Sequence, residues 1–366
     1  MSTRLSESDG GKLSNRPRDT AFLQQQLRSY PPSNPKLTLY AATLLALLGI
    51  LFIPTGTTLL SQANAVFESV FVYDDNNEAS LGDCHISTAN QGAACTVVFT
   101  LDQDVTGPLY VLYELKNYYQ NHRRYFKSRS ELQLRGYSLS AVDVDLDCSP
   151  LLYNGSYLLN PCGLVANSFF NDVISLNSSS VSNAFLDESN IALSSDVDTM
   201  FKQVSGFQSV NVGSTPSSNT CDYYGLDSSC SRNYFNSVDG SYHYFSYPNE
   251  DTVQYLYESF PGIISPLDGV TDQHFIVWMR TASLPSFRKL YGVIGDENSV
   301  FINGDTFTFN IINNFEVAYF DGQKALVLTT LGSHGKNIFI GACFWIGGIS
   351  LFSFAGLMTV KELFFL

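Results

Sequence analysis

The sequence predicts two transmembrane helices flanking a large, mostly antiparallel β (α+β) ectodomain held by disulfide bonds. Two uncharged apolar runs, at residues 37–60 and 338–360 of the 366-residue chain, are the candidate spans. Six of the seven cysteines lie between them. The same interval contains AACTVVFTLDQDV and DTFTFNIINNFEV, which are rich in β-branched and aromatic residues. Such composition, with Gly, Pro and Asp at the breaks, is typical of half-buried strands.

Each apolar run is long enough to cross a bilayer. The runs hold 24 and 23 residues without Asp, Glu, Lys or Arg, and as helices they span roughly 35 Å at about 1.5 Å per residue. The motif ANA at residues 63–65 raises the alternative of a cleaved signal peptide, whose apolar region is only about 7–15 residues long. Because 24 apolar residues follow a polar segment of 36, we expect an uncleaved anchor. Lys361 and Glu362 follow the second run, which favours a true span over a removable lipid-anchor signal.

The flanking charges predict the orientation of the spans. Residues 1–36 contain six basic and three acidic side chains, and short cytosolic segments are enriched in Lys and Arg. We therefore expect residues 1–36 and 361–366 to be cytosolic tails, and residues 61–337 to form a lumenal or extracellular domain. That domain has 13 basic and 30 acidic side chains, so its field repels nucleic acids.

The cysteines fit this topology, because disulfides persist in oxidising compartments. Each cysteine of the ectodomain has one close sequence neighbour, and we predict three bonds: Cys84 with Cys95, Cys148 with Cys162, and Cys221 with Cys230. Cys343, in the second span, is expected to be a free thiol. The acceptor motifs NGS and NSS make Asn154 and Asn177 candidate sites of N-linked glycans.

Catalytic motifs are absent from the sequence. It has no Gly-rich phosphate loop with Lys-Ser/Thr, no Gly-x-Ser-x-Gly and no His-Glu-x-x-His, and its five histidines are scattered. We expect no enzymatic activity, no metal and no cofactor apart from N-linked glycans and bound phospholipid.

The motif DVDLD is the single feature that would support a membrane-anchored glycosyltransferase. Its three carboxylates could bind calcium or a nucleotide sugar; they belong to Asp143, Asp145 and Asp147. Their period of two predicts instead a strand with its carboxylates in solvent. The apolar side chains expected on the buried face of that strand are Val142, Val144 and Leu146.

The segment YELKNYYQNHRRYFKSR, residues 113–129, holds five basic residues and one acidic residue in an otherwise acidic domain. Wound at 100° per residue, it gathers aromatic rings on one side and basic groups on the other. We predict an amphipathic helix with a buried aromatic face that includes Tyr119, His122 and Phe126. Its basic face either pairs with acidic residues of its own domain or contacts a partner's acidic loops or lipid phosphates. The candidate contact residues are Arg123, Arg124 and Lys127.

The longer motifs resemble one known family. They are RPRDTAFLQQQLRSYPP at residue 16, the basic segment, QLRG at 133, PCGLVANSFFND at 161, WMRTASLPSFRKLYGVI at 278 and IINNFEVAYFDGQKALVLTT at 311. Together they resemble the Cdc-fifty or ligand-effect-modulator family, accessory (beta) subunits of type-IV P-type ATPases, the phospholipid flippases. The resemblance runs from about residue 16 to the second span and weakens between residues 175 and 231.

The resemblance implies a non-catalytic subunit that forms a heterodimer with one type-IV P-type ATPase. It implies a role in that enzyme's assembly, in its exit from the endoplasmic reticulum and in phospholipid translocation. The implied location is the endoplasmic reticulum, the Golgi or endosomes, or the plasma membrane.

Two further segments are candidate contacts. The tail of residues 16–31 would place Phe22 and Gln26 on one helical face, which we expect to dock on the partner's cytosolic side. Gly341 and Gly348 form a small-residue strip where another helix can approach closely, either a partner's helix or the first span.

A subunit of a two-span ligand-gated channel is the alternative function. Such channels share the two spans, the cytosolic ends and the disulfide-rich ectodomain. Neither span contains a charged residue, which argues against an ion-conducting pore.

Overall fold

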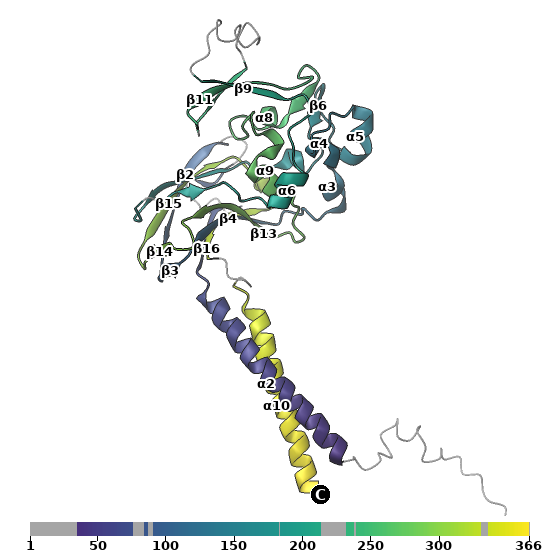
Figure 1. Cartoon of the computed structure of the whole chain (residues 1–366), viewed down its shortest axis with the longest axis vertical. Coiled ribbons are helices and arrows are strands. Elements are labelled where there is room, and N and C mark those ends of the chain that lie inside the picture. The colour runs from purple at the N-terminus through teal and green to yellow at the C-terminus, as the bar shows by residue number, and fades with distance from the viewer. Residues whose placement is uncertain are drawn as a thin grey trace, which may run out of the picture. The chain divides into compact units, whose positions relative to one another are not determined.

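A computed structural model of the chain describes residues 35–75, 84–86, 91–182, 184–213, 232–237, 239–330 and 336–365. The chain divides into two compact units. One combines Met1–Ala65 with Gly332–Leu366, and the other is Val66–Leu331 (Figure 1). Two terminal apolar helices thus flank a mostly antiparallel β domain with two disulfides, and the predicted fold class is confirmed.

The first unit is a pair of long helices, α2 (Pro35–Ala65) and α10 (Ile338–Phe365). Both are long and apolar enough to cross a membrane, and only 11% and 17% of their most apolar windows are buried. A core helix of a soluble protein would be mostly buried, whereas these helices present Leu, Ile and Phe outward. A bilayer can cover such surfaces, because it replaces water with hydrocarbon.

Glycines allow α2 and α10 to approach each other closely. A Cβ added to Gly56 would lie 2.7 Å from the backbone nitrogen of Trp345. One added to Gly341 would lie 3.0 Å from the nitrogen of Leu60, and one added to Gly348 would lie 2.7 Å from Cγ1 of Ile53. Gly341 and Gly348 therefore face α2, as in the second of the two alternatives.

Replacing Gly56 with Leu is expected to destabilise the helix pair by about 1–3 kcal/mol, because the new side chain meets the backbone of α10. Gly356→Leu is the matched control, since a Cβ at Gly356 meets nothing within 4 Å. The thermal unfolding midpoint of the full chain in mild detergent measures both. Equal midpoints for the two variants would show that the glycines do not set the helix spacing.

The described part of the second unit contains five small sheets. The largest has the order β1-β16-β4-β13-β8, and a three-stranded sheet has the order β2-β15-β7. Their strands are β1 (Glu68–Asp74), β16 (Gln323–Thr329), β4 (Leu109–Lys116), β13 (Phe287–Ile294), β8 (Leu186–Asp187), β2 (Ala93–Thr100), β15 (Thr306–Asn313) and β7 (Val173–Ser179). The other sheets are β14 (Val300–Phe301) with β3 (Val105–Thr106), β12 (Val253–Tyr255) with β6 (Tyr157–Asn160) and β5 (Tyr153–Asn154), and β10 (Asn233–Asn236) with β11 (Ser241–Ser246) and β9 (Gln208–Gly213). All described pairings are antiparallel except β12 with β6.

The two larger sheets share one hydrophobic core. Alternate residues of β2 and β15 are buried, as their period-two patterns predict. Phe99 of β2 and Phe309 of β15 pack edge to face at 5.8 Å, and Tyr113 of β4 stacks on Phe170 at 4.0 Å. Aromatic pairs of this kind contribute roughly 0.5–1.5 kcal/mol each beyond the area that they bury.

Short helices occupy the connections. They are α3 (Arg123–Lys127), α4 (Glu131–Leu134), α5 (Ala141–Cys148), α6 (Ser194–Thr199), α8 (Leu256–Ser259) and α9 (Gln273–Met279), with 3₁₀ turns η2 (Ala166–Ser168), η3 (Gly269–Thr271) and η4 (Ala318–Phe320). The side chain of Lys289 caps the C-terminal end of α9. Its Nζ donates to the carbonyls of Val277, Trp278 and Arg280 at 3.0, 2.6 and 2.8 Å. The ammonium also lies 4.8 Å from the centroid of the Trp278 ring. The motif WMRTASLPSFRKLYGVI is therefore a structural unit, in which a buried cation binds the end of the preceding helix.

A second buried cation, Lys324, joins strands from both sheets. Its Nζ lies 2.9 Å from Oδ2 of Asp172 and 3.3 Å from Oδ2 of Asp74, and all three side chains are almost completely buried. It also donates to the side-chain oxygen of Asn313 and to a backbone carbonyl. Tyr73 donates to Asp172 at 2.8 Å, and burial, with Asp172 beside it, raises the pKa of this phenol well above its ordinary value. We call this group the Lys324 network.

Candidate partner-binding surface

The basic segment is a strand, a turn and a short helix, so the prediction of one amphipathic helix is wrong. Residues 109–116 form β4, in which the alternate residues Leu109, Val111 and Tyr113 are buried. Asn117 ends the strand with a φ of 63°, a conformation that Asn tolerates better than most residues. Only residues 123–127 are helical. Pairing with β13 and β16 overrides the helical period that residues 113–129 suggested.

The aromatic residues of this segment divide between core and surface. Tyr118 packs on Trp278 with ring centroids 5.7 Å apart, and Tyr125 packs edge to face on Tyr118 and bonds Ser168 Oγ at 2.8 Å. Tyr119 and Phe126 are 56% and 41% exposed, and His122 is also exposed. The expectation that these three side chains are buried is therefore wrong. Helix α3 has only five residues, so only one side of a single turn can pack against the core.

Replacing Phe126 with Ala is expected to cost less than about 1 kcal/mol, since an exposed ring leaves little cavity. Tyr125→Ala should cost roughly 3 kcal/mol, because it removes a ring that packs against the core. Thermal unfolding of the full chain in detergent separates the two. A loss for Phe126→Ala as large as that for Tyr125→Ala would contradict the exposed position of Phe126.

The three cations of α3 are exposed. Arg123, Arg124 and Lys127 form no ion pair with any residue that the structure describes. Most other arginines of the domain do pair. Examples are Arg129 with Glu131 at 3.2 Å, Arg232 with Glu250 at 2.6 Å, Arg280 with Asp196 at 2.5 Å and Arg288 with Glu68 at 2.9 Å. Within the described ranges, the alternative of internal pairing is therefore wrong for these three residues.

The helices α3, α4 and α5 line one hollow of about 440 Å³. Phe126, Lys127 and Leu132 form part of its wall, together with Asp147 of α5. A backbone bond of 3.0 Å from Arg129 N–H to the carbonyl of Asp147 holds α3 against α5. The exposed cations and the exposed apolar side chains of these helices define the α3–α5 surface: Arg123, Arg124, Lys127, Phe126, Leu132, Val142 and Leu146.

The motif DVDLD lies on helix α5, not on a strand. Ser140 caps the helix: its N–H donates to Oδ2 of Asp143 at 3.1 Å, and bonds from Ser140 lower the pKa of that carboxyl. The capping box Ser-x-x-Asp was the sequence signal for a helix here. Val144 is buried, whereas Val142 and Leu146 are 87% and 93% exposed, so the expected burial of the last two is also wrong.

No metal site is found in the described ranges, and helix α5 does not gather its three carboxylates. At 100° per residue Asp143 and Asp147 share a face, while Asp145 lies on another. The single support for a glycosyltransferase is thereby removed.

The predicted cysteine pairs and glycosylation sites lie mostly within the described residues. The structure joins Cys84 with Cys95 and Cys148 with Cys162, two of the three predicted pairs. Cys343 is free and exposed. Asn154 and Asn177 are both exposed on strands. Four predicted residues, Phe22, Gln26, Cys221 and Cys230, lie outside the described residues.

The chain is similar to known proteins over most of its length. Residues 59–365 match the model of the LEM3 (ligand-effect modulator 3) family / CDC50 family. The chain is 32% identical to cell cycle control protein 50A of Bos taurus, over 96% of this chain and 91% of that protein. It is 33% identical to ALA-interacting subunit 3 of Arabidopsis thaliana, over 92% and 84% of the two chains. Cell cycle control protein 50B of Homo sapiens is 31% identical, over 91% and 90%.

Proposed function

Because the chain belongs to the LEM3/CDC50 family, we propose that it is a non-catalytic accessory (beta) subunit of a type-IV P-type ATPase that moves phospholipids. The Arabidopsis relatives are named for their interaction with ALA, which supports a subunit role. The single structural observation that carries the proposal is the α3–α5 surface, which has exposed apolar side chains and three exposed cations without an ion pair to any described residue. A domain with a net charge of −17 from its 13 basic and 30 acidic residues would gain by pairing these cations with another protein.

The proposed topology places both chain ends in the cytosol and the β domain in a lumen or outside the cell. Excess Lys and Arg before α2 supports this orientation, as do the two disulfides of the β domain. We propose N-linked glycans on Asn154 and Asn177, both of which are exposed. The location proposed is the endoplasmic reticulum, the Golgi or endosomes, or the plasma membrane.

The subunit would act by contact with the ATPase, supporting its assembly, its exit from the endoplasmic reticulum and its lipid translocation. The α3–α5 surface would bind acidic lumenal loops of the ATPase. The tail around Phe22 and Gln26 would bind the cytosolic side. The helix pair α2 and α10 would present its lipid-facing apolar side chains to the membrane helices of the ATPase.

The test is a double variant, Arg123→Ala with Arg124→Ala, in the affinity-tagged full chain purified from its own membranes. We expect normal folding, because no ion pair to a described residue is lost, and recovery of several-fold less ATPase. The defect should increase with salt, since exposed charges are screened over about 8–10 Å at physiological ionic strength. Mass spectrometry quantifies the ATPase that co-purifies.

Lys202→Ala is the matched control, because Lys202 is an exposed cation outside the α3–α5 surface. It should recover as much ATPase as the parent. Equal recovery for the double variant would exclude the α3–α5 surface as the contact. Purification of the parent as a homotrimer without any ATPase would overturn the subunit function and favour a channel.

A further inference from the structure

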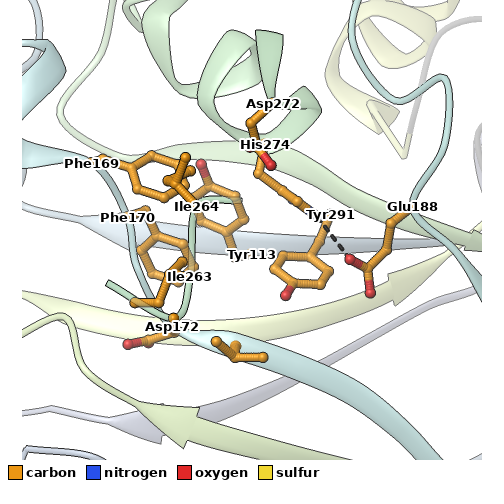
Figure 2. A pocket seen from close by; sticks show the side chains of 12 residues that line it. Tyr113, Phe169, Phe170, Asp172, Glu188, Ile263, Ile264, Asp272, His274 and Tyr291 are labelled. Carbon is orange, nitrogen blue, oxygen red and sulfur yellow. Dashed lines mark hydrogen bonds and ion pairs between the residues drawn. The ribbon is translucent and has the colours of Figure 1, made fainter. Parts of the chain in front are cut away.

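A cavity of about 180 Å³ lies in the β domain, apart from the α3–α5 surface. Strands β4 and β13, the segment before β7 and the start of α9 contribute its walls. Figure 2 shows the rings of Phe169, Phe170 and Tyr113 on one side, and Tyr291 with Glu188 on the other. Glu188 and Gly262 are exposed, so the cavity opens to solvent at that end.

Two buried phenols face this cavity with unused hydrogen-bonding capacity. Tyr113 is 3% exposed, and its hydroxyl forms no hydrogen bond to any residue within the described ranges. Tyr291 is 6% exposed, and its oxygen accepts the N–H of Ile174 at 2.9 Å. The hydrogen of the Tyr291 hydroxyl has no acceptor among the described residues. Both hydroxyls can therefore donate a hydrogen bond to a molecule in the cavity.

The electrostatic character of the cavity is negative. Its lining includes Asp172, Glu188 and Asp272 and contains no Lys or Arg. Lys324 forms an ion pair with Asp172 at 2.9 Å, and Nε2 of His274 lies 2.9 Å from Oε2 of Glu188. Asp272 caps α9 by accepting the N–H of Phe275 at 2.8 Å, and no cation of the described part of the chain pairs with it. Negative charge at the walls favours a positively charged occupant.

The aromatic lining favours the same kind of occupant. Four rings surround the space, those of Tyr113, Phe169, Phe170 and Tyr291, and aromatic faces attract organic cations. A cavity of about 150 Å³ is large enough for benzene, so this one admits a molecule of similar or slightly greater size. We propose that the cavity binds a small organic ammonium ion that also carries a hydroxyl or ester oxygen, with the ammonium among the rings and near Glu188 and Asp272.

The test measures binding of choline and ethanolamine to the purified full chain by calorimetry, without any ATPase. We expect saturable binding of both. The matched control is 3,3-dimethylbutan-1-ol, which has the shape of choline without its charge and should bind far more weakly. Equal binding of this alcohol, or no binding of either amine at millimolar concentration, would overturn the proposal.

Variants of the lining residues test how each contributes to binding. Glu188→Gln should weaken choline binding roughly tenfold, since it removes a charge near the ammonium. Glu297→Gln, an exposed acid outside the cavity, should leave binding unchanged. Tyr113→Phe keeps the ring and should weaken choline while sparing tetramethylammonium, which lacks an oxygen. If Glu188→Gln and Tyr113→Phe, both folded by thermal melt, bind choline like the parent, the ligand does not occupy this cavity.

The ammonium could belong to a free amine or to a lipid headgroup, and two further probes distinguish these sources. Glycerophosphocholine should bind like choline if a headgroup enters with its phosphate, whereas choline alone should bind if the ligand is a free amine. Because every measurement uses the chain without the ATPase, failure here would leave the proposed subunit function untouched. Likewise, failure to recover an ATPase would leave the binding result standing.

Discussion

Replacing Lys324 with Met is expected to lower the free energy of unfolding by about 3–5 kcal/mol, the cost of removing one partner from a buried ion pair. Lys324 is fully buried between Asp172 and Asp74. Without its ammonium, two carboxylates would remain in the core, held by hydrogen bonds from Tyr73 and Asn313, by two backbone N–H groups and by His85, but without the lysine between them. In a domain of this size the loss corresponds to a fall in the unfolding midpoint of roughly 10 °C.

Lys116→Met is the control for this prediction. Lys116 is 45% exposed and lies 3.3 Å from Glu114, and exposed pairs contribute only about 0–1 kcal/mol. Both variants remove one lysine beside a carboxylate, so their difference measures the effect of burial. If the two unfold at the same temperature in detergent, the Lys324 network does not stabilise the fold.

Replacing Gly163 with Ala should lower the free energy of unfolding by roughly 4 kcal/mol, about as much as Lys324→Met. Backbone strain and a clash with a neighbouring carbonyl both contribute to this loss. Gly163 has a φ of 100°. A Cβ there would lie 2.2 Å from the carbonyl oxygen of Ser128. This contact closes the end of the basic segment onto the loop of the Cys148–Cys162 disulfide, where Ser128 Oγ donates to the carbonyl of Cys148 at 2.8 Å. The thermal unfolding midpoint of the full chain in detergent measures the loss.

Gly107→Ala separates strain from clash, because Gly107 has a similar φ of 91° and no atom within 4 Å of its Cβ position. It should cost only about 1–2 kcal/mol, the price of a left-handed conformation for an L-residue. Equal losses for the two variants would mean that the close approach of Ser128 is not needed.

Local patterns in the sequence predicted several features correctly. The apolar runs predicted α2 and α10 because a helix that meets lipid is apolar all round, a property of composition that needs no knowledge of neighbours. The alternation in AACTVVFT and TFTFNIIN predicted β2 and β15, since one face of each strand meets the core. The pairs Cys84–Cys95 and Cys148–Cys162 followed from short sequence separation.

The errors share one cause, which is that a short segment has no preferred face until the rest of the chain packs on it. The period of DVDLD suggests a strand, but its cap at Ser140 and the disulfide at Cys148 hold it as a helix. Tyr119 and Phe126 are aromatic but exposed, because Tyr118 and Tyr125 occupy the available space on the core. The Ser-x-x-Asp cap was a readable signal, whereas the exposure of the rings was not.

The sequence by itself determined the two long apolar helices, the acidic β domain between them and the membership of a family, because composition and long motifs persist without knowledge of contacts. Only the tertiary structure decided what the motifs do. PCGLVANSFFND supplies Asp172, IINNFEV supplies Asn313 and FDGQKALVLTT supplies Lys324, and these three meet in one buried network. Asp172 and Lys324 are separated by 152 residues in the chain. The free energy of such a network depends on the exclusion of water by all the elements around it, so no local pattern in the sequence contains it.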